Sequence, residues 1–198
     1  MRTKGTVRTV LVATLLIIMA FCVVATPASA YNYNRYVADN YAETYALNPN
    51  SAYKYFDGAD CTNFASQVLF AGGFTETGKY QYWSDYAWYY DWGTRPGYSN
   101  TWTIANELYD FLDKSGRADR TSVDHPYYPK FQVGDIIQVD WNNDGYWDHS
   151  MVVTGIIISD DDLLMSYHSR NIKNKRLFTI KGENPGAHFG GWHIKNNY

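Results

Sequence analysis

The hydrophobic pattern of this 198-residue chain changes its period partway along the sequence. In residues 33–47 apolar and aromatic residues recur about every four positions, and residues 61–71 and 102–115 show a similar spacing, which is typical of amphipathic helices. From residue 131 onwards, short β-branched and aromatic runs alternate with clusters of Asn, Asp and Gly, which is typical of strands and turns. Helices followed by strands predict an α+β domain whose N-terminal helices pack on an antiparallel sheet.

The expected elements can be placed along the chain. The first helix should present Val37 inward, and the third should present Ile104 inward. Residues 74–100 are rich in Tyr, Trp, Gly and Asp without a steady period, so we expect a long aromatic loop there. Residues 31–198 contain no repeat and no linker, and we expect one domain. The predicted strands are 131–140, 149–158, 163–168, 177–181 and 189–194.

Residues 1–30 have the features of a secretory signal peptide. Basic residues stand at the start, residues 10–25 are apolar, and Ala28-Ser29-Ala30 forms a small-residue cleavage signal. The alternative is a retained membrane anchor, but the apolar stretch is shorter than the roughly 20 residues that span a bilayer. We therefore expect a secreted protein, associated with the cell wall or free, that keeps no membrane contact after cleavage.

Charge and composition exclude some partners. The formal net charge is −3 and the isoelectric point is about 5.9, whereas nucleic-acid-binding domains usually carry a basic face, so no nucleic acid is expected. One cysteine in the mature chain cannot build a closed structural zinc site, and no two histidines have a metal-binding spacing. We expect a monomer without metal or cofactor.

Removal of the leader also removes Cys22 and leaves Cys61 as the single cysteine. An exported protein that keeps one unpaired thiol exposes it to oxidation, which suggests that the thiol has a function. Cys61 follows a Gly/Ala/Asp turn at the expected start of a helix, where unpaired N–H groups and the helix dipole favour a thiolate. The alternative is a small core residue, although the apolar face of this helix falls on other positions, Phe64, Ala65, Val68 and Leu69.

A nucleophilic cysteine needs a base, usually a histidine, and a third group that orients the base. His149 opens one predicted strand and His168 closes the next, and adjacent antiparallel strands can bring such residues together. Asp148 neighbours His149, but consecutive strand residues point to opposite faces. We therefore expect His168 as the third residue, with Asn171 as the alternative.

Several segments of the chain resemble those of a known family. The segments Asp60-Cys61-Thr62-Asn63-Phe64, Gly134-Asp135 and Asp148-His149-Ser150 are similar to the putative amidase domain family of secreted bacterial proteins. The order of Cys on a helix, His on a strand and a polar residue on the following strand resembles that of papain-like cysteine hydrolases. The resemblance covers nearly the whole mature chain.

This resemblance implies a papain-like fold related to the NlpC/P60 and CHAP hydrolases. It implies an amide-containing substrate, such as the peptides of peptidoglycan, cleaved through an acyl-enzyme. Cys61 would be the nucleophile and His149 the general base and acid, and His168 matches the third position loosely. Two alternatives stay open, namely a non-catalytic wall- or glycan-binding module that uses the aromatic surface, and an acyltransferase with the same Cys–His pair.

One loop imitates the start of a calcium-binding loop. Residues 140–145 read Asp-Trp-Asn-Asn-Asp-Gly, and Asp148 occupies the ninth position, but Met151 stands where the bidentate Glu would be. A polar turn between two strands explains the same residues without an ion.

Overall fold

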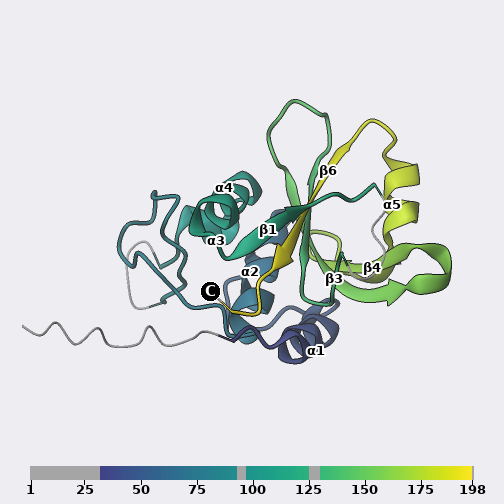
Figure 1. Ribbon diagram of the computed structural model, residues 1–198. Helices are drawn as coiled ribbons and strands as arrows, with labels where there is room; N and C mark the ends of the chain where they lie inside the picture. The colour runs from purple at the N-terminus through teal and green to yellow at the C-terminus, as the bar shows by residue number, and fades with distance from the viewer. Residues whose placement is uncertain (1–31, 93–96, 125–129, 198) are drawn as a thin grey trace, which may run out of the picture.

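Six antiparallel strands form one sheet in the order β1-β6-β2-β3-β4-β5, and helices lie on both of its faces (Figure 1). The computed structural model describes residues 32–92, 97–124 and 130–197. The expected signal peptide at 1–30, Cys22 and His125 lie outside these residues. The α+β class and the antiparallel sheet predicted from the sequence are confirmed.

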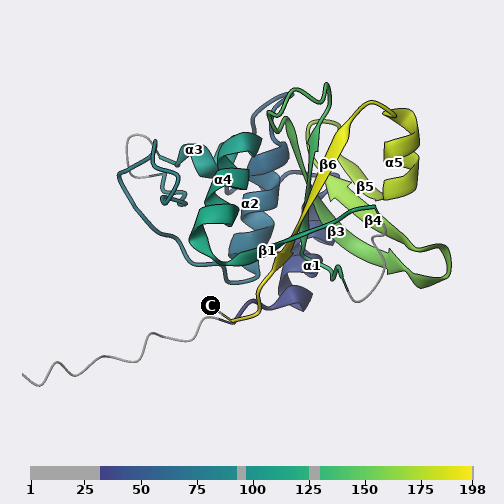
Figure 2. The same cartoon turned by 45° about the horizontal axis from the view of Figure 1, so that its top comes forward.

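The helices fall into two groups. Helices α1 to α4 cover one face of the sheet and α5 covers the other, as Figures 1 and 2 show from two directions. Within the described residues, no helix has the length and apolar character needed to cross a bilayer. The helices are α1 (Arg35–Tyr45), α2 (Cys61–Ala71), α3 (Asn100–Thr103), α4 (Ala105–Ser115) and α5 (Leu177–Glu183).

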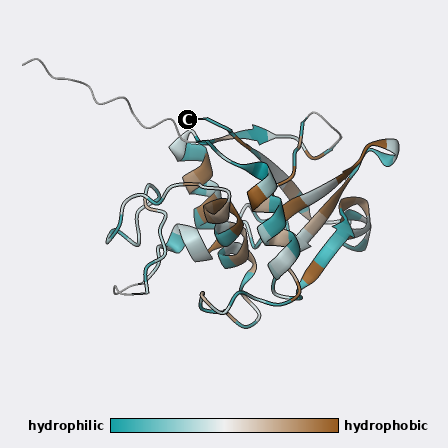
Figure 3. Ribbon diagram, turned by 90° about the horizontal axis from the view of Figure 1, so that it is seen from below, coloured by the Kyte–Doolittle hydropathy of each residue, from teal (hydrophilic) through white to brown (hydrophobic). Residues whose placement is uncertain are grey.

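The strands supply two hydrophobic cores because consecutive residues point to opposite faces. In β2, Ile136 packs under α1, α2 and α4, whereas Ile137 and Val139 pack on the α5 side. In Figure 3 the long loops that precede α3 are largely hydrophilic, whereas apolar residues concentrate in the helices and strands. The strands are β1 (Ala118–Thr121), β2 (Ile136–Asp140), β3 (His149–Ile157), β4 (Asp162–Tyr167), β5 (Ile172–Arg176) and β6 (His188–Ile194).

The segment 177–181, predicted as a strand, is helical. Leu177 and Ile180 are both buried on the sheet, which is a helical spacing hidden in a short β-branched run. The first turn is held from outside the segment, because the backbone N–H of Phe178 donates to Asp162 Oδ1 at 3.0 Å. Tertiary contacts thus override the local propensity, and β5 directly before this helix is a strand that the pattern did not predict.

The helix predicted at 102–115 is broken. Ile104 has extended backbone angles and separates α3 from α4, and its side chain is 37% exposed instead of buried. In α1, Val37 is also exposed, and the buried face consists of Ala38 and Ala42. These small residues let α1 approach the fold closely, which a pattern that gives weight to large apolar residues does not reveal.

A buried carboxylate connects the N-terminal helix to the sheet. Asp135, just before β2, accepts hydrogen bonds from Arg35 Nη1 at 2.6 Å and from the backbone N–H of Ile194 at 2.9 Å. Its other oxygen accepts from the backbone N–H of Gln132 and from His193 Nδ1. Asp135 is fully buried, so its charge depends on these partners.

Substitution Asp135→Ala should lower the free energy of unfolding by about 3 kcal/mol, because the partly buried Arg35 guanidinium and two N–H groups lose their acceptor. Asp119→Ala is the matched control, since Asp119 forms an exposed ion pair with Lys195 and its removal should cost under about 1 kcal/mol. Urea unfolding of both variants measures the difference. Equal losses would show that the buried network contributes no more than a surface pair.

Candidate active site

The first turn of α2 and the first residue of β3 meet at the floor of a cleft. Cys61 begins α2, His149 begins β3, and both side chains are 7% exposed. The neighbouring residues join the two elements, because Thr62 Oγ1 and Ser150 Oγ are hydrogen-bonded at 3.0 Å. Gln138 Nε2 on β2 also donates to Ser150 Oγ, at 3.2 Å. The cysteine and the histidine selected from the sequence therefore lie together.

The pKa of the Cys61 thiol shows how the pair interacts. Burial raises this pKa, but the charge of His149 and a hydrogen bond with its side chain lower it. The backbone of Ser150 and the hydroxyl of Thr62 lower it further, and the result is a pKa of about 7 against an ordinary value of 9.0. A substantial part of Cys61 is thus thiolate at neutral pH, which is the nucleophilic form.

Two aromatic rings hold His149. The ring of Tyr167 meets it edge to face with centroids 5.0 Å apart, and the ring of Trp141 lies 5.5 Å away on a tilt. The Nε2 atom of His149 is buried and has no hydrogen-bond partner among the described residues. The orientation of this ring therefore rests on packing, where the sequence analysis expected a polar third group.

His168 has other partners than His149. Its Nδ1 donates to Asp60 Oδ2 at 2.5 Å, and its Nε2 donates to the backbone carbonyl of Tyr45 at 2.8 Å. Both ring nitrogens are thus engaged, and the contact with Asp60 is buried. His168 also stacks on Phe64 with centroids 4.1 Å apart. Neither ring nitrogen is left to accept a proton from His149.

The alternation of side chains along β3 and β4 explains why His149 and His168 have different partners. Val152 pairs with Ser166 in the β3–β4 register, so Ser150 and His168 lie on the face toward α2. Tyr167, one residue earlier than His168, is the residue that contacts His149. Asn171, the alternative, follows β4 in a turn with φ 50°, and its buried Oδ1 has no partner among the described residues.

Asp60 organises the turn that presents Cys61. It is the residue before α2, yet its side chain does not cap the helix. Its Oδ1 instead accepts from the backbone N–H of Phe56 at 2.9 Å and from Asn63 Nδ2 at 2.8 Å. With His168 on the other oxygen, this carboxylate fixes the chain on both sides of Cys61. Asp60 belongs to one of the sequence motifs described above, but no role was predicted for it from the sequence.

The cleft over Cys61 and His149 has a volume of about 810 Å³ and two different walls. Loop 141–148 and the α3–α4 junction form an aromatic and apolar wall, which includes Trp141 and Trp147. The β4–β5 turn, β5 and α5 form a polar wall, which includes Arg170 and the Lys175–Glu183 ion pair. A substrate in this cleft would contact rings on one side and charges on the other.

The loop that resembles a calcium site uses its oxygens internally. The carboxylate of Asp140 accepts from the backbone N–H groups of Asp144 and Gly145, and Asp148 Oδ2 accepts from the backbone N–H of Trp141 at 2.9 Å. Asp144 in turn accepts from Asn142 Nδ2 and from the backbone of Tyr146. These bonds favour the polar-turn interpretation, and they give Asp148 a place in the turn.

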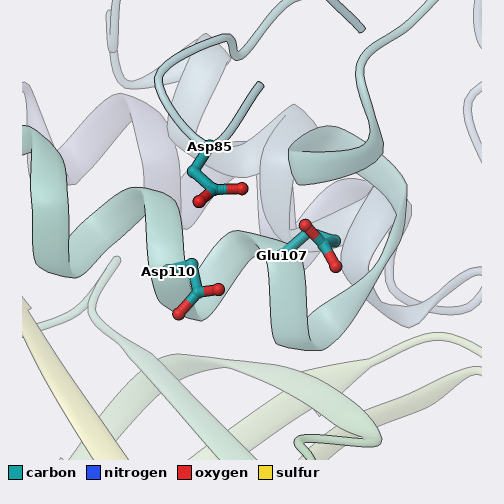
Figure 4. Close-up of side chains that lie close together, drawn as sticks. All are labelled: Asp85, Glu107 and Asp110. Atoms are coloured by element: carbon teal, nitrogen blue, oxygen red, sulfur yellow. The ribbon is translucent and has the colours of Figure 1, made fainter. Parts of the chain in front are cut away.

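Three carboxylates gather elsewhere, on the outer side of α4. Asp85, Glu107 and Asp110 have oxygens within 4.8 Å of one another (Figure 4), and none of them lines the cleft. The ammonium group of Lys114 pairs with Asp85 and lies 3.9 Å from Asp110, so an internal cation compensates part of this charge. Burial, followed by the charges of Asp85 and Asp110, raises the pKa of Glu107.

Comparison with known proteins points to one family. The family model described as a putative amidase domain matches residues 32–191. The chain is 33% identical over 156 residues to the uncharacterized protein YjcM of Bacillus subtilis (strain 168), covering 75% of this chain and 34% of that protein. It is 33% identical over 124 residues to the uncharacterized protein YhbB of the same strain, covering 63% of this chain and 38% of that protein. The chain thus spans about a third of the length of these relatives, and no solved structure matches it.

The rate at which iodoacetamide alkylates Cys61 should follow the fraction of Cys61 that is thiolate. A plot of this rate against pH should have its midpoint near pH 7. In His149→Ala the burial of the thiol persists while the lowering by His149 is lost, so the midpoint should move to the ordinary value of 9.0 or above. Mass spectrometry of the modified peptide over a pH series measures both midpoints. An unchanged midpoint in His149→Ala would contradict the interaction.

Substitution His168→Ala should leave the buried Asp60 side chain without one of its partners and lower the free energy of unfolding by about 3 kcal/mol. Because Asp60 fixes the turn before Cys61, the alkylation midpoint should also rise, which a purely stabilising residue would not change. Lys173→Ala removes an exposed ion pair with Glu43 and serves as the control, with little effect on either quantity. A wild-type midpoint in His168→Ala would contradict a positioning role.

Proposed function

This chain belongs to the putative amidase domain family, and we propose that it is a cysteine hydrolase that cleaves an amide bond with Cys61 as the nucleophile. The observation that carries the proposal is that Cys61 and His149 line one cleft together, where His149, with Ser150 and Thr62, lowers the pKa of the thiol to about 7. This pair faces an open cleft of about 810 Å³, so the thiolate can meet a substrate. A buried structural cysteine would need neither a basic partner nor access.

In the first half of the proposed reaction, His149 takes the thiol proton and the Cys61 sulfur attacks the amide carbonyl carbon. The carbonyl oxygen becomes an oxyanion, and the backbone N–H of Cys61 at the start of α2 is the donor best placed for it, since the first N–H groups of a helix have no partner inside the helix. The C–N bond then breaks, His149 returns the proton to the leaving amine, and a thioester to Cys61 remains.

In the second half, water replaces the amine. His149 accepts a proton from water as the hydroxyl attacks the thioester carbonyl, and the C–S bond breaks to release a carboxylic acid and regenerate the thiol. His149 needs the same orientation in both halves. Tyr167 and Trp141 supply it by contact, at 5.0 and 5.5 Å between ring centroids.

We further propose that the fold is a variant of the papain-like plan, with a relation to the NlpC/P60 and CHAP hydrolases. The support is the order of a cysteine at a helix start, a histidine at a strand start and the antiparallel sheet beside them. In this variant His168 acts on the nucleophile side through Asp60, since both of its ring nitrogens are engaged there and at Tyr45. It is a positioning residue in this scheme.

The substrate class follows from the cleft and from the expected export. An aromatic wall and a charged wall suit a peptide that carries both apolar and ionised groups, and a peptidoglycan peptide is a substrate with these properties. A signal peptide at residues 1–30 would bring the enzyme to that polymer. The curated relatives are about three times longer than the matched region, so the activity of a whole longer protein would include whatever the rest of its chain adds.

Each of Cys61→Ala and His149→Ala should abolish the release of new amino groups from purified peptidoglycan, because the first removes the nucleophile and the second its base. Both melting curves should stay near that of the wild type. Ser159→Ala, in the exposed turn after β3, is the control and should keep full activity.

Three results would decide against the proposal in different ways. Activity retained in either variant would exclude the Cys–His mechanism. Retention of the wild-type protein on peptidoglycan without any thiol-dependent cleavage would indicate a binding module. Incorporation of an added amine into the product would indicate that the same Cys–His pair catalyses acyl transfer instead of hydrolysis.

A further inference from the structure

A second pocket lies on the other side of α3 from the cleft. Its volume is about 190 Å³, and it shares no lining residue with the cleft. Trp102 on α3 lines this pocket, whereas Thr103, the next residue, lines the cleft. Five aromatic rings and one carboxylate form most of the pocket wall: Tyr53, Phe70, Tyr90, Trp92, Trp102 and Glu76.

The rings meet at different angles: Tyr53 and Trp102 are stacked at 16° with centroids 6.2 Å apart, whereas Tyr90 meets its neighbours more steeply. Tyr90 lies 4.9 Å from Tyr53 at 58° and 5.3 Å from Trp92 at 88°, measured between ring centroids and planes. Trp102 lies 5.5 Å from Tyr90 at 43°. Rings arranged in this way surround a compact group from several sides, whereas a sugar ring stacks on a flat open face. The geometry thus favours a small rounded ligand.

Three of these rings have their polar tips engaged, and since Trp102 is fully buried, the exposed Trp92 and the half-buried Tyr90 offer their faces to a ligand. The hydroxyl of Tyr90 accepts from the backbone N–H of Lys54 at 2.7 Å, and Trp92 Nε1 donates to the carbonyl of Ala52 at 2.6 Å. Trp102 Nε1 donates to Asn63 Oδ1 at 2.9 Å. Rings fixed before binding lose little conformational entropy on binding.

Charge selects the kind of ligand. Glu76 is the one acidic residue in the pocket wall, and its Oε1 accepts from the backbone N–H of Tyr90 at 2.8 Å. Among the described residues, no basic side chain pairs with it. Its charge reaches the pocket, because the pKa of Tyr53 is raised by burial and then by Glu76. Ring faces carry negative potential too, so both elements of the wall attract a cation.

We propose that this pocket binds a quaternary trimethylammonium group. Such a group is compact, carries a diffuse positive charge and has no N–H donors that the rings would leave unpaired, so it fits a wall of ring faces with one carboxylate. Among the exposed aromatic residues of segment 74–100, Trp92 is the one that thereby acquires a ligand. The site is separate from Cys61, and the proposal does not depend on the amidase mechanism.

Titration of the full chain with choline, followed by tryptophan fluorescence and calorimetry, tests the proposal. Saturable binding is expected, and 3,3-dimethylbutan-1-ol, the uncharged isostere of choline, should bind about tenfold more weakly because it keeps the shape and loses the charge. Glycerophosphocholine carries the same group on a phosphodiester. Its tighter binding would identify a headgroup on a lipid or polymer as the source, and tighter binding of choline would identify the free compound.

Two variants separate the ring contribution from the carboxylate contribution. Trp92→Ala removes an exposed ring, and Glu76→Gln keeps an acceptor for the N–H of Tyr90 while it removes the charge. Each should weaken choline binding about tenfold. Trp83→Ala removes an equally exposed ring of the same segment that does not line the pocket, and it should bind choline like the wild type. Cys61→Ala should also bind normally, which keeps this result independent of catalysis.

Several outcomes would overturn the proposal. Equal affinity for choline and its uncharged isostere would show an apolar pocket without cation selection. The absence of saturable binding by choline would exclude the site, and binding of N-acetylglucosamine oligomers in its place would assign the rings to a glycan. If Trp92→Ala melts below the wild type, Glu76→Gln decides, because it alters one exposed atom.

Discussion

The carboxylate of Asp60 is the group on which the arrangement of the site depends. It is buried, and a buried charge is tolerated only where hydrogen bonds and an opposite charge replace water. Its partners come from three parts of the chain, namely the loop before α2, α2 itself and the residue after β4. Satisfying one side chain therefore fixes where α2 begins and how α2 lies against the sheet. The same bonds extend outward through Asn63, which accepts from Trp102, so α3 is placed by the same group.

The sheet completes the arrangement through its period of two. Ser150 points toward α2 and bonds with Thr62, which joins the helix to β3 one residue beyond each reactive side chain. His149 and Tyr167 take the alternate face and contact each other. The two functions of β3, attachment and chemistry, are thus assigned to consecutive residues. A change of register by one residue would exchange them.

Much of this could be predicted from the sequence, and the exceptions have physical reasons. The periods of the hydrophobic pattern predicted an α+β domain, and the position of Cys61 at a helix start with a strand-borne His149 identified the residues that meet in the cleft. His168 was expected beside His149 because both are histidines at strand ends. Its partner is Asp60, 108 positions away, and no local pattern reports such a contact. No role was predicted for Tyr167, which is one of 19 tyrosines in the chain.

The secondary structure shows the same limit. Residues 177–181 have strand-forming side chains, yet they are helical because Asp162 and the sheet face supply their partners. By contrast, Gly134 and Asp135 are explained once the structure is known. Gly134 has φ +83° and lies where a side chain would meet the hydroxyl of Tyr33, and Asp135 holds Arg35. The dipeptide is visible in the sequence, but the residues that require it, Tyr33 and Arg35, lie about a hundred positions earlier.

The hydrogen bond between Tyr33 and Asn196 also affects how this fold can be inserted into a longer chain. The backbone N–H of Tyr33 donates to the carbonyl of Asn196 at 2.8 Å, so the two ends of the described fold lie side by side (Figure 1). A domain whose entry and exit coincide can be spliced into another polypeptide as a self-contained insert, since the host chain leaves and resumes at nearly the same point. The fold can in this sense be inserted into a longer chain at a single point.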